Sequence, residues 1–231
     1  NADLSRDEIG TGTMAAGIVV SEGKNNPAYR GIAPKAELIV IKLRSYISLF
    51  KEGRINYKNT DFLVAISYII QKFKEINRPI ILNFTLGTTS GRDISQTLLN
   101  TFNELYQSGF ILVSGAGNQG NTDTHTEGII ESSGDIKDIE IRVGEKQKNL
   151  PIEIWVNKPN RVKLSIISPS GEMIDNLDSK NANNERIKFL YEGTEMIVNF
   201  TSPELSTGDS HIFIRAYNLK AGIWKFRLTG Q

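Results

Sequence analysis

The first half of the chain alternates short apolar runs with stretches in which apolar residues recur every three or four positions. The runs are nearly continuous, which is typical of β-strands covered on both faces. They are Glu37–Lys42, Pro79–Phe84 and Phe110–Ser114. Between the first two runs, apolar residues from Phe62 to Phe73 follow a helical spacing, and Asn59 or Thr60 can cap the start of this helix.

A second helical pattern lies between the second and third runs. It contains Ile94, Leu98, Phe102 and Leu105, and Gly109 is placed to end it. The order strand, helix, strand, helix, strand predicts right-handed βαβ units and a parallel sheet within residues 1–134. Three strands alone would leave long unpaired edges, so we expect further strands of this sheet before residue 1 and after residue 231.

In the second half of the chain, residues 135–231, the apolar residues recur with a different period. Apolar and polar residues mostly alternate, and turn signals such as Pro169-Ser170-Gly171 separate several of the short segments. This pattern predicts an antiparallel β-sandwich or jelly roll, with Asp175–Glu185 as a loop. The predicted strands are Asp138–Val143, Pro151–Val156, Arg161–Ser168, Arg186–Leu190, Glu195–Phe200, Ser210–Tyr217 and Ile223–Thr229.

The aromatic residues of the second half are predicted to form the sandwich core. They are Trp155, Phe189, Phe200, Phe213 and Trp224. We expect Trp224 to be mostly buried, whereas Trp155 competes for the core with Ile152, Ile154 and Val156, which share the other face of its strand. The alternative is that the aromatic side chains line a sugar- or peptide-binding face.

Composition narrows the classes of function. The 27 basic and 26 acidic residues leave a formal charge of +1, which indicates neither a nucleic-acid-binding protein nor one attracted to an anionic membrane. We expect no signal peptide, and no apolar run reaches the roughly 18 residues of a membrane-spanning helix. Cysteine is absent and the histidines are only His125 and His211, so we expect no disulfide, metal site or cofactor.

Four short motifs rich in glycine and small residues occur in the first half. Each alone is a weak signal, because a glycine-rich strand end is usually a tight turn. In chain order they are Gly10-Thr11-Gly12-Thr13-Met14-Ala15-Ala16-Gly17, Gly31-Ile32-Ala33-Pro34-Lys35-Ala36, Asn83-Phe84-Thr85-Leu86-Gly87 and Ala116-Gly117-Asn118-Gln119-Gly120.

In this order the motifs resemble those of the subtilisin-like serine proteases, the subtilases, over residues 1–130. The resemblance implies an α/β fold, with residues 1–134 as a partial subtilisin-like parallel-sheet domain. The alternating pattern of residues 135–231 predicts that an all-β jelly-roll or sandwich insert follows it. The resemblance also implies a serine nucleophile, a histidine general base and an asparagine side chain that stabilises the oxyanion. Carried over by motif, the oxyanion-hole position is Asn118, and Thr85, Leu86 and Gly87 line the substrate cleft.

The resemblance breaks down at the catalytic base. Where the family has histidine, this chain has Thr11, whose hydroxyl cannot act as a base near neutral pH. The family's aspartate is expected upstream of residue 1, and the Gly-Thr-Ser-x-Ala motif of the nucleophile does not occur before Gln231. We therefore predict that the chain contains no competent catalytic residue.

Four other ionisable residues are candidates for a role in catalysis. His125 follows Asn118 and is more typical of a loop histidine bonded to the backbone than of a base, while His211 heads a predicted strand and is expected to be solvated. Asp3 and Asp7 lie too close to Thr11 to be the family's aspartate. We expect them in the approach to the helix.

The β-rich insert narrows the resemblance further, to the clostridial Csp subtilases of spore germination. Threonine at the histidine position is most like the pseudoprotease branch of that group, CspC. The resemblance implies a spore protein that senses a germinant or relays the signal to an active Csp protease, with other Csp proteins or a small-molecule germinant as partners.

Two other interpretations stay open. The first is an active serine endopeptidase that processes a cortex-lytic hydrolase, with the motif misaligned or with His125 as the base. The second makes the sandwich a module that only stabilises the protease fold, which is compatible with a pseudoprotease.

Overall fold

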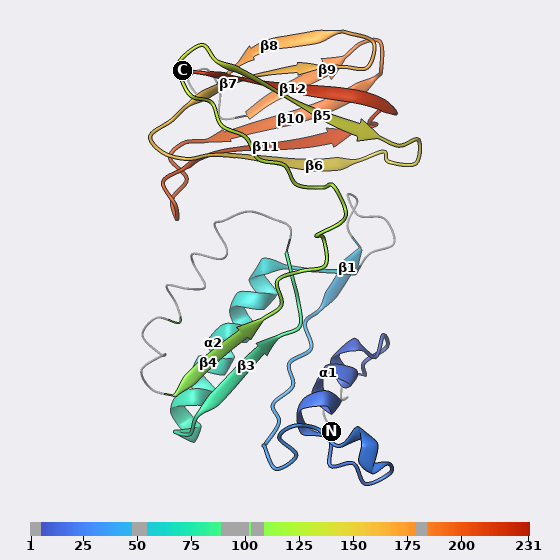
Figure 1. Ribbon diagram of the computed structural model, residues 1–231, viewed down its shortest axis with the longest axis vertical. Helices are drawn as coiled ribbons and strands as arrows, with labels where there is room; N and C mark the ends of the chain where they lie inside the picture. Colours follow the sequence, from blue (N-terminus) through green and yellow to red (C-terminus); the bar gives the residue numbers. More distant parts are fainter. Residues whose placement is uncertain (1–5, 48–54, 89–101, 103–108, 179–183) are drawn as a thin grey trace. The chain divides into compact units, whose positions relative to one another are not determined.

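The computed structural model describes residues 6–47, 55–88, 102, 109–178 and 184–231. These residues fall into two compact units, shown in Figure 1. The helix–sheet unit takes its described residues from 1–46, 55–87 and 105–117, and the sandwich unit takes its residues from the rest of the chain. The predicted boundary at residue 134 is not tested by this division and stays a prediction.

In the residues described, the helix–sheet unit contains two α-helices and a parallel pair of strands. Strands β3 and β4 pair in parallel from Ile80↔Phe110 to Phe84↔Ser114, as the sequence predicts. Among the described strands, β1 and β2 pair with each other and with no other strand. The elements are α1 (Thr11–Val20), the 3₁₀ helix η1 (Pro27–Tyr29), β1 (Ser45–Ile47), β2 (Ile55–Tyr57), α2 (Asn59–Ile76), β3 (Ile80–Phe84) and β4 (Phe110–Ser114).

Helix α2 covers one face of the β3–β4 sheet. Its apolar stripe buries Ile66, Ile69 and Phe73. The Phe73 ring meets the edge of Phe110 at a centroid distance of 5.5 Å. The helix is therefore confirmed, but its predicted cap is wrong: Asn59 and Thr60 already lie inside the first turn, and the capping position belongs to Lys58, whose side chain makes no capping bond.

The predicted first strand, Glu37–Lys42, is not a strand. The segment pairs with no other strand among the residues described, and Val40 is 70% exposed. A strand is defined by hydrogen bonds to a neighbouring backbone, so apolar side chains alone do not make one. Lys42 and Glu37 instead tether the segment, through the Arg6 carbonyl and through a 2.8 Å ion pair with Arg78.

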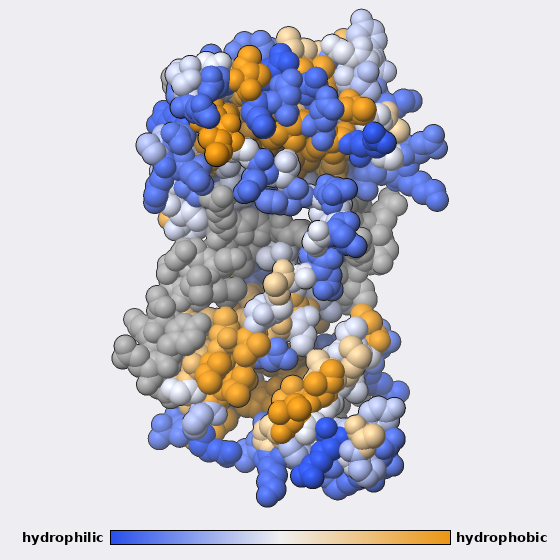
Figure 2. Space-filling model, in the orientation of Figure 1, coloured by the Kyte–Doolittle hydropathy of each residue, from blue (hydrophilic) through white to orange (hydrophobic). Residues whose placement is uncertain are grey.

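The second face of the β3–β4 sheet was also predicted to be covered. Instead, Ile81, Ile111 and Val113 are 67%, 52% and 47% exposed in the described structure, and Figure 2 shows apolar surface on this unit. A continuous apolar run shows that both faces of a strand are apolar, not that both are covered. The predicted helix from Ile94 to Leu105 falls outside the described residues, except for the buried Phe102.

The segment after α1 packs back on that helix through its own backbone. The N–H groups of Gly31, Ile32 and Ala33 donate to the carbonyls of Ser21, Ile18 and Val19, at 2.8, 3.1 and 2.7 Å. A Cβ atom at Gly31 would lie only 2.7 Å from the Ser21 nitrogen. The glycine of the Gly-x-Ala-Pro motif is therefore required by this close approach.

The sandwich unit consists of two antiparallel sheets, as predicted. One has the strand order β6-β11-β10-β9 and the other β5-β12-β7-β8. The α/β fold with a parallel sheet and a β-rich insert is thus confirmed. The strands are β5 (Ile136–Val143), β6 (Leu150–Val156), β7 (Val162–Ile167), β8 (Met173–Leu177), β9 (Asn184–Phe189), β10 (Thr194–Thr201), β11 (Ser210–Tyr217) and β12 (Gly222–Gly230).

The core between the two sheets contains three of the five predicted aromatic residues. Trp224, Phe189 and Phe200 are 1%, 0% and 7% exposed. Trp155 and Phe213 were wrongly placed there: Ile154 and its alternate neighbours fill the inner face of β6, which turns Trp155 outward, and Phe213 faces outward on β11.

Strand β8 was missed by the sequence pattern. The segment Asp175–Glu185 was predicted as a loop, yet Asp175, Asn176 and Leu177 belong to β8. Leu177 is buried and lies opposite Leu164 of β7, across an irregular register. The Ser165 hydroxyl also donates to the Asp175 carboxylate. One buried leucine and one side-chain hydrogen bond are too few to produce a visible alternation.

The two ends of the sandwich meet. The N–H of Gly134 donates to the carbonyl of Gly230 (3.0 Å), and the N–H of Gly230 donates to the carbonyl of Asp135 (2.9 Å). The chain therefore enters the first strand beside the end of the last one. Such an arrangement allows a module to replace one surface loop of another fold.

We expect Trp224→Ala to lower the free energy of unfolding of the sandwich by about 3–5 kcal/mol, because it leaves a cavity between the sheets. Urea unfolding followed by circular dichroism measures this loss. Trp155→Ala is the control, since Trp155 lies half-buried on the outer face. Equal losses for the two variants would contradict the assignment of the inner faces.

We expect Gly31→Ala to destabilise the helix–sheet unit by about 1–3 kcal/mol, because its Cβ atom would collide with backbone atoms that cannot rotate away. Gly17→Ala is the matched control: no atom lies within 4 Å of its Cβ position, and alanine favours a helix interior by about 0.5–1 kcal/mol. Thermal unfolding of both variants gives the comparison. A Gly31→Ala protein as stable as the parent would show that the loop can move away from α1.

Candidate functional site

Thr11 is the first residue of α1, and its side chain is exposed. The helix can begin there because Gly10, at the capping position, adopts a left-handed conformation with φ 88°. Residues with a Cβ atom rarely adopt this conformation. The local sequence thus places the side chain of residue 11 at an open helix start.

Asp7 holds this helix start in place. Its Oδ2 atom accepts hydrogen bonds from the Thr13 N–H (2.8 Å) and the Thr13 hydroxyl (2.9 Å). Its Oδ1 atom accepts from the N–H groups of Gly10 (2.8 Å) and Ile9 (3.2 Å). The backbone hydrogen bonds from Thr13 and Gly10 are the main reasons that the pKa of Asp7 lies well below its usual range.

Asp7 therefore lies in the approach to the helix, as predicted, and acts as its cap. Sequence reasoning placed it correctly but did not assign this role. An aspartate a few residues before a helix start was the available signal. Asp3 lies outside the described residues.

The predicted cleft residues follow the parallel strands. Thr85, Leu86 and Gly87 come directly after β3, and Gly115 to Gly117 come directly after β4. Because β3 and β4 run in parallel and end at the pair Phe84↔Ser114, both segments leave the sheet at the same edge. This is the edge at which open α/β sheets bind ligands.

Asn118 follows the second of these segments. Gly117 turns the chain with φ 93°, and the N–H of Asn118 donates to Oε1 of Gln119 at 2.9 Å. The residue is exposed. The role of Asn118 at the oxyanion and those of Thr85, Leu86 and Gly87 in a cleft stay predictions.

Both histidines lie in the sandwich unit, whereas Thr11 lies in the helix–sheet unit. His125 is exposed. His211 is not solvated as predicted: its ring stacks on Trp155 at a centroid distance of 4.0 Å, and Nε2 lies 3.5 Å from Glu153 Oε2. Trp155 and Phe213, on the outer face of β6 and β11, stack on this histidine and leave its side chain 19% exposed.

The Thr11 side chain offers a hydroxyl group at the helix start. A threonine hydroxyl donates and accepts hydrogen bonds but does not take a proton near neutral pH. Over the described ranges, no group of three or more histidine, aspartate or glutamate residues is placed to hold a metal ion. Within the same ranges, no helix is long and apolar enough to cross a membrane.

Comparison with known proteins gives the family. Residues 1–170 match the model of the Subtilase family. The chain is 34% identical over 116 residues to the minor extracellular protease Epr of Bacillus subtilis (strain 168), a match that covers 50% of this chain and 16% of that protein. It is 30% identical over 114 residues to subtilisin of Bacillus sp. (strain TA39), covering 49% of this chain and 25% of that protein.

A solved structure resembles nearly the whole chain. The CspB protease of Clostridium perfringens matches 97% of this chain and 46% of its own chain, with a TM-score of 0.80 and 22% sequence identity. At this identity the likeness concerns the fold. The present chain spans less than half the length of each of these proteins. The family match over residues 1–170 covers well over half of the sequence, and the chain therefore belongs to the subtilase family.

Proposed function

We propose that this chain is part of a catalytically inactive subtilisin-like protein that acts by binding, in bacterial spore germination. The single observation that carries the proposal is Thr11. By the motif match it stands where the family has histidine, and Asp7 and Gly10 hold the start of its helix in place. A protein that keeps this scaffold without the base can still bind at the cleft but cannot activate a serine.

The proposed role in spore germination depends on the β-rich insert, residues 135–231. The likeness to the CspB protease of Clostridium perfringens extends over 97% of the chain, so it includes the sandwich as well as the helix–sheet unit. Threonine in place of the base supports the pseudoprotease branch, CspC. The protein would then reside in the spore and sense a small-molecule germinant, or relay the signal to an active Csp protease.

The alternative function is an active serine endopeptidase that processes a cortex-lytic hydrolase. It is favoured by the names of the similar proteins, all of which are proteases. This alternative needs a base other than Thr11, and His125 is the exposed candidate.

We expect the full-length protein to react with a fluorophosphonate probe no faster than a heat-denatured sample, because a serine without a positioned base is a weak nucleophile. Labelling is measured by mass spectrometry, with a commercial subtilisin as the positive control. Thr11→His is expected to remain unlabelled if the nucleophile is also missing. Thr11→Ala is the matched control for loss of the threonine itself.

Three outcomes separate the functions. Rapid labelling of the unaltered protein at a serine overturns inactivity and supports the endopeptidase. Labelling only of Thr11→His shows that the missing base is the sole defect. No labelling in either protein, combined with a germination defect in spores that lack the gene, supports a binding role; normal germination of those spores would contradict it.

A further inference from the structure

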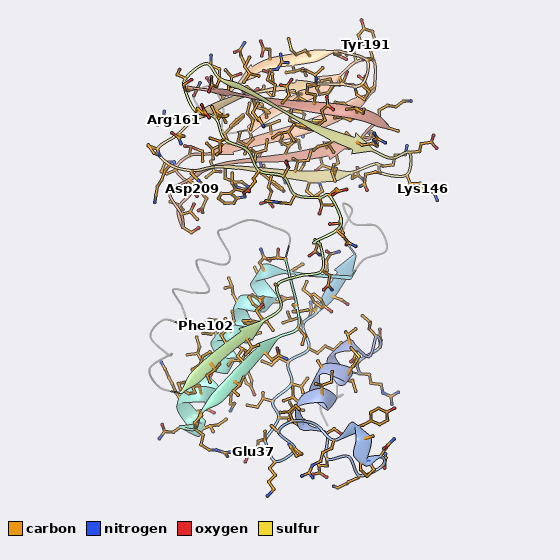
Figure 3. All side chains as sticks on the ribbon, viewed as in Figure 1. Glu37, Phe102, Lys146, Arg161, Tyr191 and Asp209 are labelled. Carbon is orange, nitrogen blue, oxygen red and sulfur yellow. The ribbon has the colours of Figure 1, made fainter. Side chains whose placement is uncertain are left out.

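We draw no further inference here: the strongest candidate, the cluster of Trp155, His211 and Phe213 on the outer face of strands β6 and β11 in the sandwich unit (side chains drawn in Figure 3), has rings that stack on one another, and nothing in the described structure shows what covers it.

Discussion

The edge-to-face contact between Phe189 and Trp224 joins the two sheets of the sandwich. The ring centroids lie 4.9 Å apart at an interplanar angle of 85°, and the residues come from β9 and β12, which belong to different sheets. The Trp224 indole N–H also donates to the Lys220 carbonyl at 2.9 Å. The edge-to-face contact and the indole hydrogen bond together hold Trp224 in the core, so the Trp224 face of β12 and the Phe189 face of β9 both turn inward.

The residues on the outer faces of the sandwich follow from which faces of the strands turn inward. Once Ile154 and its alternate neighbours turn inward on β6, Trp155 must face outward, and antiparallel pairing places His211 directly opposite it on β11. The stacked pair, with Glu153 beside it, is therefore a consequence of core packing. Its geometry assigns no catalytic role to His211.

The helix–sheet unit depends on a different constraint, the close approach of backbone to backbone around α1. Gly31 allows the following segment to bond to the end of the helix, and Asp7 satisfies N–H groups at its start. Neither contact involves the side chain of residue 11. The start and the end of α1 are therefore fixed independently of the side chain at position 11, because these interactions use backbone groups and the Asp7 carboxylate.

The sequence by itself determined the elements whose stability comes from a local period: helix α2 and the alternation of most sandwich strands. It also identified the family, through four motifs in order. Only the tertiary structure decided that Glu37–Lys42 pairs with no described strand, that β8 exists and that Trp155 and His211 face outward. A period of two residues shows that two faces differ, whereas the choice of the buried face and the existence of a partner strand depend on residues far away in the chain.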